Sequence, residues 1–476
     1  MGGLLPYGYP ASVERVELPN PAEDGGGWRR RALRWLQLPS AAGEVEAETP
    51  SVVQRRRMCG RLPQFGAEAV DLMATVPAEG ERVRARWSGV ARCDSWACPV
   101  CSQGKAMEAA VEVCAAMDVL KRAGAAGYLV TMTLGHSAGE ALESVLSDLL
   151  SAWGSVSGGR WWGSVLPEGS KKVAVVKALE TTHGRNGWHP HLHLLLILSE
   201  PLSAVWTCYR RDPESRMMGR AVMEELASVR RRREELRDAD STLARNLELR
   251  GLRERELELE RDLGSFGWAS DESMLAGAIR ERWSRAVARK GREAGAEAVK
   301  FERVTNPARY LMKAGLEVAG GSLKRGRRGN ATPWDLLHTA ATAPIGAERV
   351  EALGLYREWE AAMHGRHPIT GLGRALDLLW VSEADLVAAR LQLDPQPLER
   401  LVARVPAALW LALVARGLDL DLLELIEAGD EARALAALSA ALSSQWGRVR
   451  PDRAAAAAAA VLQAPAGALE LEKLSV

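Results

Sequence analysis

The chain has 476 residues, and a length of this size predicts two to four domains because single domains usually hold roughly 100 to 200 residues. Apolar residues make up 47% and charged residues 26%, which excludes a chain that is disordered throughout, and no apolar run reaches the roughly 18 residues that cross a bilayer. The formal net charge is +1, but the charge is unevenly distributed: residues 371–476 hold 10 Lys/Arg against 14 Asp/Glu, a net charge of −4 that leaves +5 for residues 1–370. Net charge alone therefore neither supports nor excludes binding to nucleic acid.

The first ten residues lack the basic stretch followed by an apolar stretch that marks an export signal. We therefore expect a cytoplasmic protein with no membrane partner. Residues 1–57 are rich in Gly, Pro and Arg, and we expect this segment to be poorly ordered. Its one dense patch is Trp28-Arg-Arg-Arg-Ala-Leu-Arg-Trp35, which could grip phosphates and stack on bases or could equally be a solvated surface turn.

Residues 58–125 are expected to form a small cysteine-rich module. Three of its cysteines lie in Cys93-Asp-Ser-Trp-Ala-Cys98-Pro-Val-Cys101, a spacing that predicts one side of a tetrahedral Zn²⁺ site. We expect Cys59 to be the fourth ligand because it precedes a glycine, whereas Cys114 falls on a helix predicted over residues 103–123. The alternative is that these are reduced, buried or redox cysteines, although a redox pair would not explain the third cysteine of the motif.

Residues 126–345 are expected to form an α+β domain with a central antiparallel sheet flanked by helices. The β-rich run 128–134 predicts a strand and residues 140–154 predict a helix. A strand over 172–180 and a seven-residue turn over 181–187 lead to a central strand over 188–198, whose continuously apolar second half predicts burial on both faces.

A charged segment at about 204–290 interrupts this pattern. Apolar residues at steps of three, four and seven predict a helical hairpin with one apolar seam, either a solvated insertion or a dedicated DNA arm. A further strand is predicted over 297–305. Residues 346–476 are rich in Ala and Leu and carry no cluster of reactive side chains, so we expect a mostly helical packing or interaction module.

Three of the eight histidines, His189, His191 and His193, occupy alternate positions of one predicted strand and therefore share a face. Imidazoles at alternate positions can bind one metal ion, while Leu192 is expected to face the core. Glu180 on the neighbouring strand supplies an oxygen ligand that suits Mg²⁺ or Mn²⁺. The alternative is a strand that only tolerates histidines on a solvated face.

A second group lies in Asn306-Pro-Ala-Arg-Tyr310-Leu-Met-Lys313. Asn306 fits a helix N-cap, so Tyr310 is expected near a helix start with Lys313 on the same face, where it could bind a phosphate oxygen or lower the pKa of the tyrosine. Taken alone, this pattern is common in packing tyrosines. The basic loop that follows suits DNA phosphates and contains Lys324, Arg325, Arg327 and Arg328.

Together these motifs resemble the HUH endonucleases, and specifically the plasmid rolling-circle replication initiators (Rep proteins) with a single catalytic tyrosine. The resemblance rests on His189-Pro-His191-Leu-His193, the upstream Glu180 and Tyr310-Leu-Met-Lys313, and it covers roughly residues 58–380. The cysteine motif, Thr131-Met-Thr133-Leu, Thr332-Pro-Trp-Asp-Leu-Leu337 and Tyr356-Arg-Glu-Trp support it by their order. Two departures are the insertion at 204–290 and Asn306, where related initiators often carry Glu.

The resemblance implies a DNA-nicking endonuclease and strand transferase that uses Tyr310 as nucleophile and Lys313 to stabilise phosphate charge. It also implies a metal held by His191, His193 and Glu180, with His189 as a second-shell or alternate ligand. Structural zinc would lie apart, at Cys59, Cys93, Cys98 and Cys101. The implied partners are plasmid origin DNA, a host helicase and polymerase, and a second copy of the chain.

Three alternatives remain open at this point. One is a relaxase or single-tyrosine transposase of the same superfamily, against which the preceding cysteine module argues. The second is a zinc-dependent DNA-binding regulator without catalysis. The third is a metallohydrolase that releases free phosphate ends and needs no tyrosine.

Overall fold

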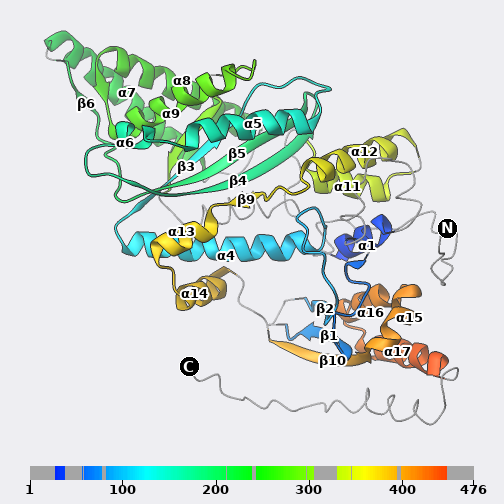
Figure 1. Ribbon diagram of the computed structural model, residues 1–476. Coiled ribbons are helices and arrows are strands. Elements are labelled where there is room, and N and C mark those ends of the chain that lie inside the picture. The colour runs from blue at the N-terminus through cyan, green and yellow to red at the C-terminus, as the bar shows by residue number, and fades with distance from the viewer. Residues whose placement is uncertain are drawn as a thin grey trace.

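Two antiparallel sheets, each with its own apolar core, organise the chain (Figure 1). The computed structural model describes residues 27–37, 56, 58–77, 82–210, 212–237, 243–295, 297–304, 330–344, 346–393 and 398–446. Helices and antiparallel strands together confirm the α+β class. Within the described residues, no helix combines the length and the apolar character needed to span a membrane.

The larger sheet has five strands in the order β8-β3-β5-β4-β9, and all neighbours are antiparallel. The strand β5 (Gly187–Leu198) is central, and its residues 192–198 are all buried, as the continuous apolar run predicts. The other strands are β3 (Ala126–Met132), β4 (Lys172–Gly184), β8 (Val299–Arg303) and β9 (Ile369–Thr370).

The connection between β4 and β5 is shorter than the sequence indicates. β4 continues through residues 181–184, and a two-residue turn at Arg185 and Asn186 returns the chain, so the expected seven-residue turn is wrong. The β-branched Thr181 and Thr182 favour an extended backbone, which explains why the strand continues. Gly187 has φ +79°, where a side chain would also meet the Ser137 carbonyl. The hairpin pairs Glu180 directly with His191.

Helices cover both faces of the five-stranded sheet (Figure 1). One face, called here the α5 face, packs against α5 (Leu142–Ser157) and α9 (Asp271–Ala288). The other, called the α4 face, packs against α4 (Cys101–Arg122) and α13 (Leu372–Leu379). At the end of the sheet that holds the β4–β5 turn, α11 (Pro333–Thr342) and α12 (Ala347–Ala362) extend the core with aromatic side chains.

The smaller sheet has the order β10-β1-β2, formed by β1 (Ala69–Thr75), β2 (Ala85–Ser88) and β10 (Glu399–Pro406). Its covered face packs against α15 (Ala407–Ala415), α16 (Leu418–Glu427) and α17 (Glu431–Trp446). The C-terminal region therefore contributes a strand to a sheet begun by residues 69–88. The structure joins parts of the ranges 58–125 and 346–476, which the sequence pattern separates, because β1 pairs with both β2 and β10.

The helix α1 (Gly27–Leu36) corrects the expectation for the N-terminal segment. Its residue Arg29 is 1% exposed and lies between the rings of Trp28 and Trp334, where burial lowers the pKa of the guanidinium to about 9. Three further arginines of the patch pair with acidic residues of α16: Arg30 with Glu427, Arg31 with Glu424 and Arg34 with Asp419. The patch thus holds α1 against α11 and α16 through a buried arginine and ion pairs. It is therefore neither a solvated surface turn nor a set of arginines left unpaired for phosphate binding.

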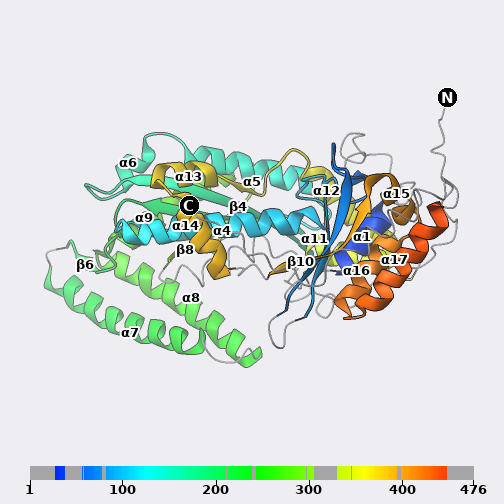
Figure 2. The same ribbon diagram turned by 90° about the horizontal axis from the view of Figure 1, so that it is seen from below.

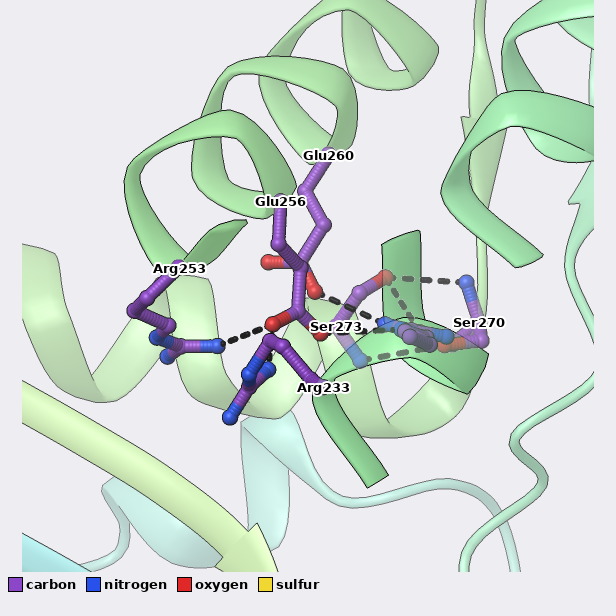
Figure 3. Close-up of polar contacts among 7 residues, drawn as sticks. Arg233, Arg253, Glu256, Glu260, Ser270 and Ser273 are labelled. Carbon is purple, nitrogen blue, oxygen red and sulfur yellow. Dashed lines mark hydrogen bonds and ion pairs between the residues drawn. The ribbon is translucent and has the colours of Figure 1, made fainter. Parts of the chain in front are cut away.

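The insertion projects from the five-stranded unit at the opposite end from the smaller sheet (Figures 1 and 2). Its hairpin consists of α7 (Pro213–Arg237) and α8 (Leu243–Ser265), with β6 (Thr207–Cys208) and β7 (Trp268–Ala269) at its base. The expected apolar seam is present and includes Leu226 and Val229. Beside it the buried carboxylate of Glu256 pairs with three arginines, namely Arg230, Arg233 and Arg253. Figure 3 shows Arg233 and Arg253 next to this carboxylate.

The helix α9 was expected within the insertion but packs in the core of the five-stranded sheet, with Leu275, Ile279 and Trp283 fully buried. It begins at a capping box in which Ser270 and Ser273 exchange hydrogen bonds (Figure 3). The projecting segment therefore ends at about residue 269. One more helix, α14 (Glu383–Leu393), lies against α4.

Candidate metal centre

The strongest candidate site is formed by Glu180 of β4 and by His191 and His193 of β5. The Nε2 atoms of His191 and His193 lie 2.9 and 3.0 Å from the same carboxylate oxygen, Oε2 of Glu180. One ligand atom from each residue lies within 4.8 Å of the other two, so the three side chains could hold a single metal ion. The side chains are 9 to 15% exposed, which leaves a metal reachable from solvent.

Strand periodicity and register create this group. The odd-numbered residues of β5 share the α4 face with Leu195 and Ile197, while Leu192 is fully buried on the α5 face as predicted. The direct pairing of Glu180 with His191 places the carboxylate on the α4 face as well. A one-residue slip of the hairpin would turn Glu180 away from both histidines.

The second ring nitrogen of each histidine also has a partner. His193 Nδ1 lies 3.2 Å from Thr131 Oγ1, and His191 Nδ1 lies 3.4 Å from the main-chain oxygen of His189. If each Nδ1 carries the proton and donates to its oxygen, each Nε2 keeps a lone pair directed toward Glu180. Ligand histidines usually have their second nitrogen fixed in this way, so two imidazoles and one carboxylate could together hold a divalent metal ion.

His189, expected as an alternate or second-shell ligand, lies outside the three-residue group. Its Nδ1 is 2.8 Å from Nε2 of His136, whose Nδ1 is 3.1 Å from the carbonyl of Asn186. Burial, followed by the neighbouring His191 and His136, lowers the pKa of His189 to about 4, so its ring is neutral at pH 7. His136 was missed at the sequence level because it stands alone after a strand and belongs to no spaced pattern.

The second group of possible metal ligands is formed by Cys59, Cys93, Cys98 and Cys101. The Sγ atom of Cys59 lies 3.5 Å from that of Cys101 and 3.9 Å from that of Cys98, and Cys93 lies 3.7 Å from Cys101. Hydrogen bonds from neighbouring thiols, that of Cys59 first, lower the pKa of Cys101, which also begins helix α4. Four sulfur atoms at these distances could hold Zn²⁺.

Cys114 lies outside the group of four cysteines, in agreement with the expectation that Cys59 is the fourth member. It belongs to a separate apolar cluster with Val111 and Ala389, and burial raises the pKa of its thiol to about 11. A neutral thiol in apolar surroundings is a packing residue.

The remaining expected site residues lie outside the described residues. These are Asn306, Tyr310, Lys313, Lys324, Arg325, Arg327 and Arg328. The described chain stops at Val304, whose N–H donates to Gly127, and resumes at Asn330. Ala331 then pairs with His183, so the chain resumes beside the strand that carries Glu180.

Residues 84–203 match a family model described as Replication protein. The matched segment includes the three clustered cysteines, Glu180, His191 and His193. The resemblance to the plasmid replication initiators is confirmed over this part of the chain.

Two curated relatives were found. A protein named Protein rep from Streptomyces lividans is 30% identical over 138 residues, which cover 23% of this chain and 30% of the relative. A protein named Neomycin resistance protein from Streptomyces cyanogenus is 24% identical over 135 residues, which cover 23% of this chain and 31% of the relative. The chain thus spans less than a third of the length of either relative. No solved structure matches.

Proposed function

We propose that the protein initiates rolling-circle replication of a plasmid by cutting one DNA strand at the origin through a covalent link to Tyr310. The observation that carries this proposal is the convergence of Glu180, His191 and His193 inside the segment that matches the replication protein family. The antiparallel sheet with two histidines on its central strand supports the HUH type of nuclease.

A divalent ion held by these three side chains would act as a Lewis acid on the scissile phosphate. The chain's own contribution begins with the rigid hairpin, which keeps both Nε2 atoms at 2.9 and 3.0 Å from one carboxylate oxygen. Thr131 and the His189 carbonyl fix the orientation of the two rings through Nδ1. Leu194, Leu195 and Leu196 next to the ligands are buried and anchor this part of β5.

In the proposed reaction the hydroxyl oxygen of Tyr310 forms a bond to phosphorus, and the bond between phosphorus and the 3′ oxygen breaks. The tyrosine loses its proton and the departing 3′ oxygen gains one, which leaves a 5′-phosphotyrosine and a free 3′-hydroxyl that a polymerase can extend. Lys313 is proposed to stabilise the phosphate charge. The basic residues Lys324, Arg325, Arg327 and Arg328 are proposed to hold neighbouring phosphates.

The cysteine group is proposed to hold a structural Zn²⁺ that has no part in cleavage. Cys59 lies ten positions before β1 of the smaller sheet, and Cys101 begins α4, which packs against the larger sheet. One ion bound there would connect the two units through four protein ligands, which is the closed arrangement of structural zinc sites. A host helicase and a second copy of the chain are further proposed partners.

Incubation of the purified full-length chain with supercoiled plasmid and Mn²⁺ tests the proposal. We expect relaxed circles that carry covalently bound protein, and we expect none with EDTA or with Tyr310→Phe. Cleavage that persists in Tyr310→Phe would favour the metallohydrolase. Specific binding without any cleavage would favour a DNA-binding regulator.

A further inference from the structure

Lys300 lies in the same cross-strand row as the candidate metal centre. It occupies the edge strand β8, where it pairs with Thr131 of β3, and Thr131 pairs in turn with His193 of β5. Residues directly opposite one another in antiparallel strands project to the same face. Lys300, Thr131 and His193 therefore form one row across the sheet.

The neighbours of Lys300 confirm which face this is. Phe301 stacks on Tyr128 with ring centroids 5.1 Å apart, and Arg303 approaches Glu272 of α9, so the odd-numbered residues of β8 point to the α5 face. The even-numbered residues Lys300 and Glu302 consequently point to the α4 face. Glu302 lies one row farther from His193 than Lys300 does, opposite Leu129.

Lys300 is exposed, and within the described residues no hydrogen bond or ion pair engages its ammonium group. Its strand neighbour Arg303, by contrast, lies 3.8 Å from a carboxylate oxygen of Glu272. A DNA strand that crosses this face would add one negative charge per phosphate, which an available lysine can neutralise.

The distance between Lys300 and His193 determines which phosphate of the DNA strand the lysine could contact. Neighbouring strands lie about 4.8 Å apart, so the main chain of Lys300 is roughly 10 Å from that of His193. Along its axis a stacked strand advances about 3.4 Å per nucleotide, and an extended strand advances farther. The distance therefore corresponds to about one to three nucleotides.

From this row we propose that Lys300 binds a backbone phosphate of the single strand about one to three nucleotides from the scissile phosphate. The DNA strand then follows this row from β5 over β3 to the edge strand β8, next to the part of the α4 face that α4 and α13 cover. Lys300 is a substrate-positioning residue without base preference, because an ammonium group binds phosphate as a point charge. This inference rests on the proposed nicking function.

The experiment measures binding of a single-stranded 20-mer centred on the nick mapped in the plasmid assay. All proteins carry Tyr310→Phe so that binding is measured without cleavage, and Lys300→Gln is compared with Lys290→Gln. Lys290 is an exposed lysine just after α9, on the opposite side of the sheet. Each phosphate within three nucleotides of the nick is replaced in turn by an uncharged methylphosphonate.

We expect Lys300→Gln to raise Kd about fivefold at low salt and to reduce the salt dependence of log K by about 0.7, the value for one single-strand phosphate contact. One methylphosphonate should weaken binding of the parent protein but not of Lys300→Gln. Lys300→Arg should restore most of the affinity, and Lys290→Gln should bind like the parent.

The proposal is overturned if Lys300→Gln binds like Lys290→Gln. It is also overturned if every methylphosphonate weakens both proteins equally, because the lysine then contacts none of these phosphates. Either result would leave the nicking function intact as long as the protein with Tyr310 still forms an adduct. An absence of nicking and adduct with Tyr310 present would instead count against the function itself.

Discussion

The five-stranded and three-stranded sheets are both antiparallel and both packed against helices, but their strands are paired over very different distances along the chain. The side chains of the candidate metal centre lie on β4 and β5, which a two-residue turn connects. In the smaller sheet β1 pairs with β10, and the ion pair between Asp71 and Arg404 joins residues 333 positions apart. Local contacts thus position the candidate site, whereas the smaller unit depends on the whole chain.

The largest expected effect is the loss of cleavage when one of the proposed metal ligands on the β4–β5 hairpin is replaced. His193→Ala should lower oligonucleotide cleavage by at least about 100-fold, because the ion would lose one of its two imidazoles. His364→Ala, which removes an exposed histidine after α12, is the matched control and should cleave normally. Equal cleavage rates for the two variants in a single-turnover assay would exclude His193 as a ligand.

The next effect tests what connects the two sheets. Cys98→Ser should remove bound zinc and lower the melting temperature of the whole chain, because zinc binding contributes directly to folding. Metal analysis of the purified protein should find about one zinc per chain, with Cys114→Ser as a control that retains it. A protein that contains no zinc and melts like Cys98→Ser would contradict the proposed zinc site.

A substitution in the core of the smaller sheet should show that the two units unfold independently of one another. Trp410 is fully buried in the core of the smaller sheet, and Trp410→Ala should cost about 3 to 5 kcal/mol of stability there. Hydrogen exchange should show β1, β2 and β10 losing protection together while the β4–β5 hairpin keeps its own. Simultaneous loss in both sheets would show instead that the chain unfolds as one unit.

The smallest effect concerns the helical insertion, which belongs to neither sheet. Glu256→Gln weakens a buried carboxylate that three arginines share, and we expect about 2 kcal/mol of local destabilisation with unchanged oligonucleotide cleavage. Glu258→Gln is the control because its ion pair with Arg255 is about half exposed and contributes little. Reduced cleavage in Glu256→Gln alone would favour the DNA-arm interpretation of this hairpin.

The difference between the units also explains what the sequence could predict. The alternation of His189, His191 and His193 and the apolar run after them are local patterns, so the central strand and the pairing of Glu180 with two histidines were predictable. The turn length was not, because threonines suit strands and turns alike.

Two other features could not be predicted from local sequence. Nothing in residues 69–88 indicates that β1 pairs with β10. The burial of Arg29 depends on tryptophans from two separate helices, α1 and α11. Both features arise only when distant segments meet. His136 is a third case, since its role becomes visible only through its hydrogen bond to His189.

The most direct test of the account identifies the residue that becomes attached to DNA. The full-length chain would be incubated with Mn²⁺ and a single-stranded oligonucleotide that spans the mapped nick, digested with protease and nuclease, and analysed by mass spectrometry. The account predicts one nucleotide-modified peptide, that of Tyr310, in the native chain and none in Glu180→Gln. A modification on another residue, or cleavage without any modified peptide, would contradict it.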